Sequence, residues 1–276
     1  MTDTSVSATV PAPPPVRGVL LDVDGVIHVG WQAIPGAAAA LAMLDRAGVP
    51  YRFLTNTTTL SRASLGARLR QIGLPIADDL LLTAPLATAA YLQQQHPAAR
   101  CYLIATGDVA ADLRDAGITL VPDRDDAEAE VVVIGGAEAN LTYARLNRAF
   151  RLLLGGAALV AMHRNRAWRT AAGMTLDSGP FVSALEEAAG VRATTIGKPA
   201  TTFFRQGLEL LGLPAEAVAM VGDDAHNDLA PARQLGMRTV LVRTGKLVGA
   251  AEIAHADWVL DSVAAVPVLL GLKEAR

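Results

Sequence analysis

Two aspartates, Asp22 and Asp24, close an apolar run in the stretch VLLDVDGV and are separated by one residue. Like charges this close disfavour joint ionisation unless a cation or hydrogen-bond donors lie beside them. Paired carboxylates in such a position suit metal binding and general acid–base catalysis, whereas by themselves they could be an ordinary turn or helix cap. The pair therefore predicts a charged site only if the rest of the chain supplies partners.

Three further polar stretches lie where ligands bind parallel sheets, namely beyond the carboxyl ends of strands or at helix starts. They are Thr55-Asn56-Thr57-Thr58, Gly197-Lys198-Pro199 and Gly222-Asp223-Asp224 with Asp228. Each has a local explanation, because aspartates commonly cap helices and a lysine before a proline is usually solvated. Their joint occurrence favours one site. A set of oxygen ligands without cysteine or clustered histidine suits Mg²⁺.

The elements that would hold these residues alternate along the chain. Ala/Leu-rich helical segments each end in a glycine that is followed by an apolar residue, at Gly48, Gly73, Gly117, Gly190, Gly212 and Gly236. Between them lie short apolar runs typical of buried parallel strands, at 18–23, 51–55, 101–105, 118–121, 131–134, 158–162, 217–221 and 239–242. The alternation predicts an α/β fold, and roughly eight strands are many for one sheet, so we expect two sheets.

Composition limits the functional classes. The chain has 276 residues, of which 51% are hydrophobic and 18% charged, enough for a large core. A net charge of −3 without a long basic run argues against nucleic acid or a membrane as the main partner. The lone Cys101 excludes an internal disulfide and a cysteine-based zinc site. The apolar run 152–162 is too short to span a bilayer, and residues 1–16 form a Pro-rich tail unlike a signal peptide, so we expect a cytoplasmic protein.

The ordered stretches hhhDxDG, hhhTN, GKP and hhhGDDxxxD, where h is apolar, resemble the motifs of the haloacid dehalogenase (HAD) superfamily. The wide gap between Thr55 and Lys198 resembles the one in the NagD-like class IIA phosphatases, where a large cap is inserted between the second and third motifs. The resemblance implies a Rossmann-like core with a parallel sheet over 17–80 and 191–276, a large inserted α/β cap over 81–190, and a flexible tail over 1–16. RFLTNTT and GPFVSALEEAAG look most like the phospholysine phosphohistidine inorganic pyrophosphate phosphatase branch, although Asp177 stands where a small residue is expected.

The resemblance also implies a chemistry. The protein would be a Mg²⁺-dependent phosphatase that hydrolyses a small phosphorylated metabolite through an aspartyl-phosphate intermediate. Asp22 would be the nucleophile, Asp24 the general acid and base, and Lys198 the cation that neutralises both Asp22 and the phosphate.

Binding roles follow from the same resemblance. The expected substrate-binding residues are Thr55, Asn56, Thr57, Lys198, His163 and Arg164, of which the last two follow a strand of the cap. The expected Mg²⁺ ligands are Asp22, Asp223 and the backbone carbonyl of Asp24, with Asp228 orienting the site from behind them. His28 is expected to line the flap after the nucleophile.

The sequence was also compared with what three other functional classes would require. A phosphotransferase or mutase of the same superfamily would carry the same motifs. A non-catalytic phospho-acceptor module would have the aspartate, threonine and lysine, but neither this length nor a partner such as Asp24. A dinucleotide-binding oxidoreductase would need a glycine fingerprint, which DVDGVIHVG is not. The expected partners are a small phosphorylated substrate and, by resemblance, a second copy of the chain bound through the cap. The stretch 123–130 is expected to be a solvated loop.

Overall fold

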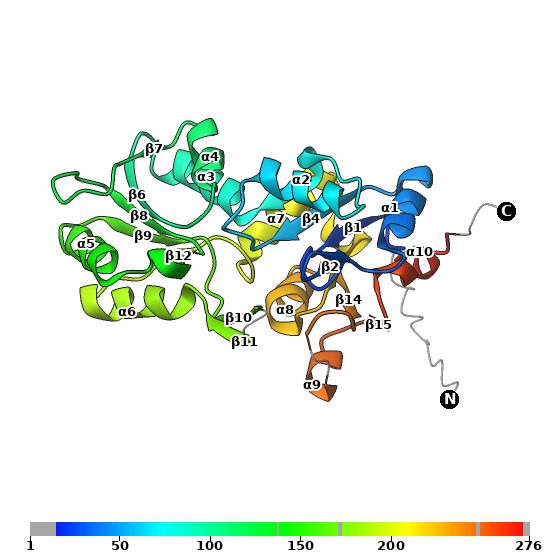
Figure 1. The fold of residues 1–276 in the computed structure, drawn as a ribbon. Helices are drawn as coiled ribbons and strands as arrows, with labels where there is room; N and C mark the ends of the chain where they lie inside the picture. Colours follow the sequence, from blue (N-terminus) through cyan, green and yellow to red (C-terminus); the bar gives the residue numbers. More distant parts are fainter. Residues whose placement is uncertain (1–14, 137, 171–172, 247–248, 273–276) are drawn as a thin grey trace, which may run out of the picture.

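The computed structural model describes residues 15–136, 138–170, 173–246 and 249–272, so most of the predicted tail lies outside the described residues. Two α/β lobes lie side by side (Figure 1), one built on a six-stranded and the other on a five-stranded sheet. The predicted α/β fold with two parallel sheets is confirmed. Within the described ranges, every helix falls short of the length and apolar character that a bilayer crossing requires.

The larger sheet forms the core lobe, with the strand order β15-β14-β13-β1-β4-β5 and parallel pairing throughout. Its strands are β1 (Gly18–Leu21), β4 (Tyr51–Thr55), β5 (Leu81–Thr83), β13 (Val218–Gly222), β14 (Arg238–Val242) and β15 (Trp258–Leu260). Its helices are α1 (Ala37–Arg46), α2 (Arg62–Gln71), α7 (Thr201–Leu211), α8 (Ala230–Gln234), α9 (Ala250–Ile253) and α10 (Val266–Leu269).

Both faces of the core sheet are buried, which explains why its strands are continuous apolar runs. In β1, Val19 and Leu21 face the cluster that α1 and α2 complete, whereas Leu20 faces Phe203 and Phe204 of α7. Side chains alternate between the two faces of a strand, so every position of β1 is apolar. The polar residues that follow β1 are therefore the first that can face solvent at this edge.

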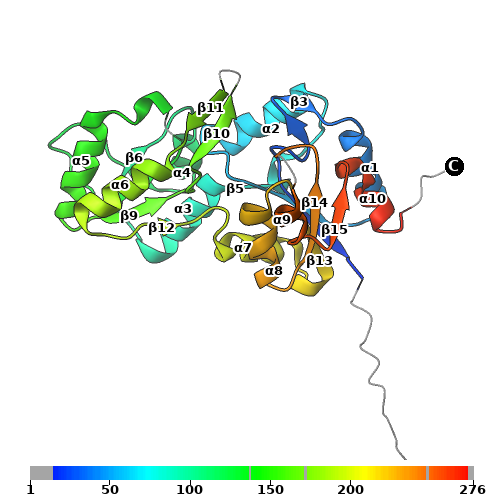
Figure 2. The ribbon, with the colours of Figure 1, turned by 90° about the horizontal axis from the view of Figure 1, so that it is seen from below.

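The smaller sheet forms the cap lobe, with the parallel order β12-β9-β8-β6-β7. Its strands are β6 (Arg100–Ile104), β7 (Thr119–Leu120), β8 (Val131–Ile134), β9 (Ala158–Ala161) and β12 (Thr194–Thr195). Its helices are α3 (Ala84–Gln95), α4 (Ala110–Asp115), α5 (Tyr143–Leu154) and α6 (Gly179–Ala189). Two hairpins flank the boundary between the lobes: β2 (His28–Val29) with β3 (Gln32–Ala33), and β10 (Ala167–Thr170) with β11 (Gly173–Leu176) (Figure 2).

The chain crosses between the lobes slightly later than the bounds predicted at 80/81 and 190/191. β5 pairs with β4 through Phe53 and Leu81, so it belongs to the core sheet. β12 pairs with β9 through Thr194 and Val160, so it belongs to the cap sheet. The first crossing therefore follows Thr83 and the return follows β12. Both strands are too short to leave a periodic signal in the sequence.

Local sequence sets the helix ends. Ser61, Thr83 and Thr142 precede α2, α3 and α5, and each side-chain oxygen accepts a hydrogen bond from a backbone amide of the first turn. The glycines predicted to end helices all have positive φ, as expected for the residue after a helix: Gly48, Gly73, Gly117, Gly190, Gly212 and Gly236. This prediction is confirmed.

The stretch 123–130 is a largely exposed loop, which confirms the predicted solvated loop, and a residue of α5 anchors it. Arg148, which is only 4% exposed, donates to Asp123 Oδ1 at 3.0 Å and to the carbonyls of Pro122 and Ala127 at 2.9 Å each. Its guanidinium also lies 4.1 Å from the ring centroid of Tyr102. One buried cation thus ties the loop to the cap sheet, a role that charge patterning in the sequence did not indicate.

Arg148→Met is expected to lower the free energy of unfolding by about 2–3 kcal/mol, because it removes a buried guanidinium that donates to Asp123 and to two loop carbonyls. Arg151→Met is the matched control on the same helix. Arg151 pairs with Asp125 at 2.8 Å, but their side chains are 54% and 82% exposed, so its loss should cost below about 1 kcal/mol. Urea denaturation of both variants measures the difference, and equal losses would contradict the role given to Arg148.

Candidate active site

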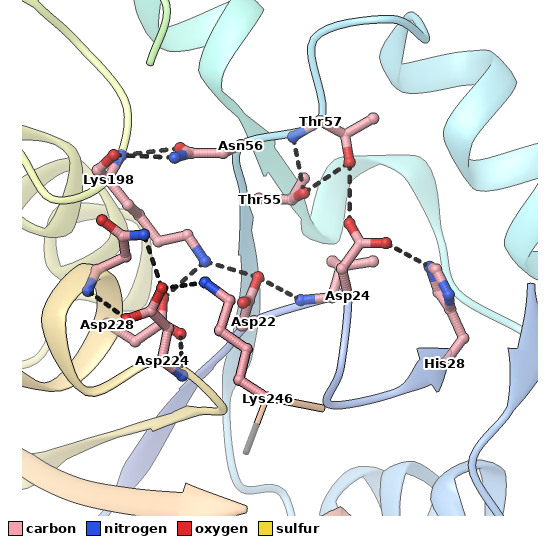
Figure 3. Close-up of polar contacts among 12 residues, drawn as sticks. Asp22, Asp24, His28, Thr55, Asn56, Thr57, Lys198, Asp224, Asp228 and Lys246 are labelled. Atoms are coloured by element: carbon pink, nitrogen blue, oxygen red, sulfur yellow. Dashed lines mark hydrogen bonds and ion pairs between the residues drawn. The ribbon is translucent and has the colours of Figure 1, made fainter. Parts of the chain in front are cut away.

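The polar residues that the sequence singled out converge at one edge of the core sheet (Figure 3). Asp22 directly follows β1, Thr55 ends β4, and Asp223 directly follows β13. Lys198 precedes α7 and extends its ammonium toward Asp22, with Nζ 2.6 Å from Oδ1. Parallel strands end at the same edge, and this brings residues from distant parts of the chain into one cluster.

Lys198 is the buried cation of the cluster. Its Nζ lies 2.7 Å from Asp228 Oδ1 in addition to its contact with Asp22, and the residue is 3% exposed. Asn56 fixes the lysine loop: its Oδ1 accepts from the Lys198 backbone amide at 2.8 Å and its Nδ2 donates to the Lys198 carbonyl at 2.9 Å. The Asn56 side chain therefore holds the Lys198 backbone, and contact of the backbone amides near Asn56 with substrate stays a prediction.

Burial and mutual repulsion perturb the acids of the cluster. Burial raises the pKa of Asp22 to about 6, although Lys198 opposes the shift. Burial, followed by the charge of Asp228, raises the pKa of Asp223 to about 6. Burial and the charge of Asp22 raise the pKa of Asp228 to about 7. Burial lowers the pKa of Lys198, but the charges of Asp22 and Asp228 outweigh it and raise the pKa above its usual value. Lys198 contacts two of these three buried acids, Asp22 and Asp228, so the cluster keeps negative charge that suits a cation.

The cluster has the donor set of a magnesium site. One ligand oxygen from each of Asp22, Asp223 and Asp228 lies within 4.8 Å of the others. The backbone amide of Lys246 donates to Asp223 Oδ2 at 2.9 Å, which orients that carboxylate. A methyl group at Gly25 or Gly245 would collide with the same carboxylate. The residues present therefore fit a hard cation with oxygen ligands, as Mg²⁺ requires.

Asp24 lies beside this cluster and is bound by hydroxyl groups. Thr57 Oγ1 donates to Asp24 Oδ2 at 3.3 Å. Thr57 Oγ1 also lies 2.9 Å from Thr55 Oγ1, and the Thr57 amide donates to Thr55 Oγ1 at 3.0 Å. Because the Thr57 hydroxyl donates to Asp24, the Thr55 hydroxyl is the donor to Thr57. The two predicted phosphate-binding threonines thus form a chain of hydroxyls that ends on the carboxylate of Asp24.

Two family models match the chain, and both describe haloacid dehalogenase-like hydrolases, over residues 19–119 and 195–266. A bovine relative (Bos taurus), the haloacid dehalogenase-like hydrolase domain-containing protein 2, is 38% identical over 237 residues, which cover 86% of this chain and 88% of the relative. The chain belongs to the haloacid dehalogenase-like hydrolases. The resemblance noted in the sequence is confirmed.

Further likenesses refine the placement of this hydrolase. The human phospholysine phosphohistidine inorganic pyrophosphate phosphatase is 34% identical over 265 residues, covering 92% of the chain and 94% of the relative. The p-nitrophenyl phosphatase from Archaeoglobus fulgidus has a TM-score of 0.85 and 30% identity over 93% of this chain and 100% of that one. NagD from Escherichia coli K-12 has a TM-score of 0.80 and 25% identity, covering 91% and 98%. The hydrolase is a NagD-like phosphatase with a cap domain.

The two cap residues predicted to contact substrate have other partners in this hydrolase. His163 is 2% exposed, and its Nε2 lies 2.9 Å from Thr58 Oγ1, which also accepts from the Gly136 amide at 2.7 Å. Asp177 Oδ1 lies 3.8 Å from the same Nε2. Arg164 forms a bidentate salt bridge with Glu186, in which its two terminal nitrogens donate to the two carboxylate oxygens at 3.0 and 2.7 Å. The structure therefore places His163 at the junction of cap and core, and Arg164 within the cap.

Sequence reasoning missed the loop after β14, whose residues complete the cluster. Lys246 forms an ion pair with Asp224, and Thr244 Oγ1 donates to the Gly25 carbonyl at 2.5 Å. Burial raises the pKa of Asp224, but Lys246 and nearby backbone amides outweigh it and hold the pKa below its usual value. The sequence did contain a signal for this loop, because it follows an apolar strand, β14, that ends at the same edge of the sheet as β1, β4 and β13. The rule that located the other residues would also have pointed to this loop.

Proposed function

We propose that this hydrolase is a Mg²⁺-dependent phosphatase that releases phosphate from a small phosphorylated metabolite, with Asp22 as the nucleophile. The observation that carries the proposal is the buried ammonium of Lys198, 2.6 Å from Asp22 Oδ1, within a cluster of carboxylates. A cluster of this kind can hold a cation and a phosphoryl group together while keeping the attacking oxygen charged.

Asp22, Asp223 and the Asp24 backbone carbonyl would hold Mg²⁺. When bound, the cation would offset the charge of the phosphoryl group, so that a carboxylate can approach it. Asp228 holds its neighbours in place with both carboxylate oxygens. Its Oδ1 binds the Lys198 ammonium, and its Oδ2 accepts from the Asp224 amide at 3.3 Å. Lys198 holds the nucleophile and would also neutralise the transferring phosphoryl oxygens.

The reaction has two steps. In the first, a carboxylate oxygen of Asp22 bonds to phosphorus while the bond from phosphorus to the leaving oxygen breaks, and Asp24 gives its proton to that oxygen. In the second, Asp24, now a carboxylate, takes a proton from water as the water oxygen bonds to phosphorus. The bond from phosphorus to Asp22 breaks, which frees inorganic phosphate and restores both aspartates.

A small substrate is supported by the way the cap meets the core. Asp108 of the cap accepts from the Ser61 amide and hydroxyl at 2.7 Å each, at the start of the core helix α2. Thr58, next to the hydroxyl chain, is bound by His163 and Gly136 of the cap. These contacts hold the cap against the loop that follows β4, so a folded phosphoprotein would have restricted access.

A screen for phosphate release tests the function. Purified protein would be assayed with Mg²⁺ or with EDTA on sugar phosphates, nucleoside monophosphates, phosphoglycolate, pyridoxal phosphate, pyrophosphate and phospholysine, with Asp22→Asn as the blank. We expect release that requires both Mg²⁺ and Asp22. Stable phosphoprotein without release would instead indicate a phospho-acceptor module, and transfer to a second metabolite would indicate a mutase.

Asp24→Asn is expected to separate the two steps, because it removes the acid and base but keeps the side-chain shape. On phenyl phosphate, whose leaving group needs a proton, turnover should fall by roughly 10²–10⁴-fold. On p-nitrophenyl phosphate, whose leaving group needs little help, the first step should persist and phosphorylated Asp22 should accumulate. Rapid-quench measurement of a p-nitrophenol burst checks this, and equal losses in the first step on both esters would contradict the acid role.

A further inference from the structure

His28 is a buried histidine that the proposed mechanism leaves without a task. It opens the hairpin β2–β3, is 1% exposed, and neither ring nitrogen has a hydrogen-bond partner within the described ranges. A buried polar group without a partner destabilises the native state, so its presence calls for an explanation.

The acid beside this ring is Asp24. His28 Nε2 lies 3.5 Å from Asp24 Oδ1 (Figure 3). The backbone holds the two residues together, because Gly25 N donates to the His28 carbonyl at 2.8 Å and Asp24 forms an isolated β-bridge with His28. A good N–H···O hydrogen bond measures roughly 2.7–3.2 Å, so a small rotation of the carboxylate closes the gap. The Asp24 side chain is 65% exposed and is therefore free to make that rotation.

The ring of Trp31 stacks on the ring of His28. Trp31 lies against it with ring centroids 4.6 Å apart and planes inclined by 16°, and the guanidinium of Arg68 lies 3.7 Å from the Trp31 ring centroid. Trp31 has a φ of 62°, a left-handed conformation that is unfavourable for a bulky residue. The hairpin thus keeps a strained tryptophan where it supports the imidazole.

The surroundings of His28 disfavour a charged imidazole. Burial lowers the pKa of His28, Asp24 opposes the shift, and the charge of Arg68 reinforces it. A neutral imidazole carries one N–H donor, and the nitrogen that faces Asp24 is Nε2.

We propose that His28 is a positioning residue for Asp24, donating its Nε2–H to Oδ1 while Thr57 donates to Oδ2. This role rests on the proposed function of Asp24 as acid and base. Two donors on opposite oxygens define the plane of an otherwise exposed carboxylate. They also stabilise its charged form after it has given its proton to the leaving oxygen. The imidazole itself exchanges no proton with substrate.

Two variants of His28 distinguish the effect of its N–H donor from the effect of its stacked ring. His28→Phe keeps a flat ring on Trp31 but has no N–H, whereas His28→Gln keeps a donor near the position of Nε2 but loses the ring. His255→Phe, at an exposed position in the loop after α9, is the matched control. The readout is kcat on phenyl phosphate divided by kcat on p-nitrophenyl phosphate, since only the former needs the acid.

We expect His28→Phe to lower this ratio by about tenfold, which is less than loss of the acid itself, with KM unchanged. His28→Gln should restore most of the ratio, and His255→Phe should leave it unchanged. An unchanged ratio in His28→Phe, a Gln variant no better than Phe, or equal losses on both esters with a higher KM would each overturn the proposal. If wild type is active and Asp22→Asn is inactive, such a result counts against His28 alone and not against the proposed function.

A second measurement needs no variant at this position. Long-range ¹H–¹⁵N spectra of the wild-type protein labelled in its histidines report which ring nitrogen carries the proton. The proposal requires the Nε2–H tautomer of His28, and its ¹⁵Nε2 signal should shift in Asp24→Asn. An Nδ1–H tautomer would overturn the proposal even if His28→Phe failed to fold.

Discussion

Asp22→Asn is expected to lower phosphate release by more than about 10⁴-fold while leaving the fold intact. An amide oxygen can still accept from the Val23 amide and from Lys198, which bind Asp22 Oδ1 at 2.7 and 2.6 Å. Lys198 also keeps its contact with Asp228 at 2.7 Å, so no buried charge is left unpaired. The amide cannot attack phosphorus, and this alone removes the first step.

The stability of Asp22→Asn should match or exceed that of the wild type in the absence of Mg²⁺. Burial raises the pKa of Asp22 to about 6, which means that the charged carboxylate is unfavourable there without a cation. Thermal melting with EDTA, together with phosphate release on the best substrate of the screen, measures both effects. Asp79→Asn, at an exposed position, is the control and should keep full activity. Residual turnover of Asp22→Asn within about 100-fold of wild type would exclude Asp22 as the nucleophile.

Lys198→Met is expected to have the largest combined effect on activity and stability. The substitution removes a buried ammonium that contacts both Asp22 and Asp228, and leaves the two carboxylates without their counter-charge. Breaking a buried pair from one side costs about 3–5 kcal/mol of unfolding free energy. Turnover should fall by about 10³-fold or more, because both the nucleophile and the phosphoryl group lose their cation.

The stability of this variant should depend on pH in a defined direction. The pKa values of Asp22 and Asp223, about 6, and of Asp228, about 7, lie above the ordinary value of 3.8. The folded state therefore binds more protons than the unfolded chain, and stability from these groups is lost as the pH rises from about 4 through 7. Without Lys198 the acids should titrate higher still, so Lys198→Met should lose more stability over this range than wild type.

Urea denaturation at pH 5 and pH 8, with EDTA or with Mg²⁺, measures this dependence. Mg²⁺ should recover more stability at pH 8 than at pH 5, because more of the carboxylates are charged there. Lys246→Met is the comparison, since its side chain is 61% exposed and its loss should cost below about 1 kcal/mol. A Lys198→Met variant as stable at pH 8 as at pH 5 would refute the role of Lys198 in offsetting the charge of the buried acids.

Short sequence patterns predicted the strands, the helix ends and the strand-end polar residues. The strands of the two sheets are short apolar runs because both faces are buried, and the helices end at glycines because their last carbonyls need a left-handed residue. The polar residues after β1, β4 and β13 had to meet, because parallel strands end at one edge. The homodimer, the cytoplasmic location and the substrate stay predictions.

The sequence by itself determined the α/β class, the two sheets and the placement of Asp22, Thr55, Lys198 and Asp223 at one site. The class, the sheets and the positions of Asp22, Thr55 and Asp223 follow from periodicity and strand direction, whereas Lys198 was placed with them by its position before a helix and by the resemblance of its motif. Only the tertiary structure decided that Asn56 serves Lys198, that His163 binds Thr58, and that His28 faces Asp24. The partners of Asn56 and His163 lie more than a hundred residues away along the chain. A hydrogen bond depends on rotamers and packing to within a few tenths of an ångström, and no local pattern specifies these.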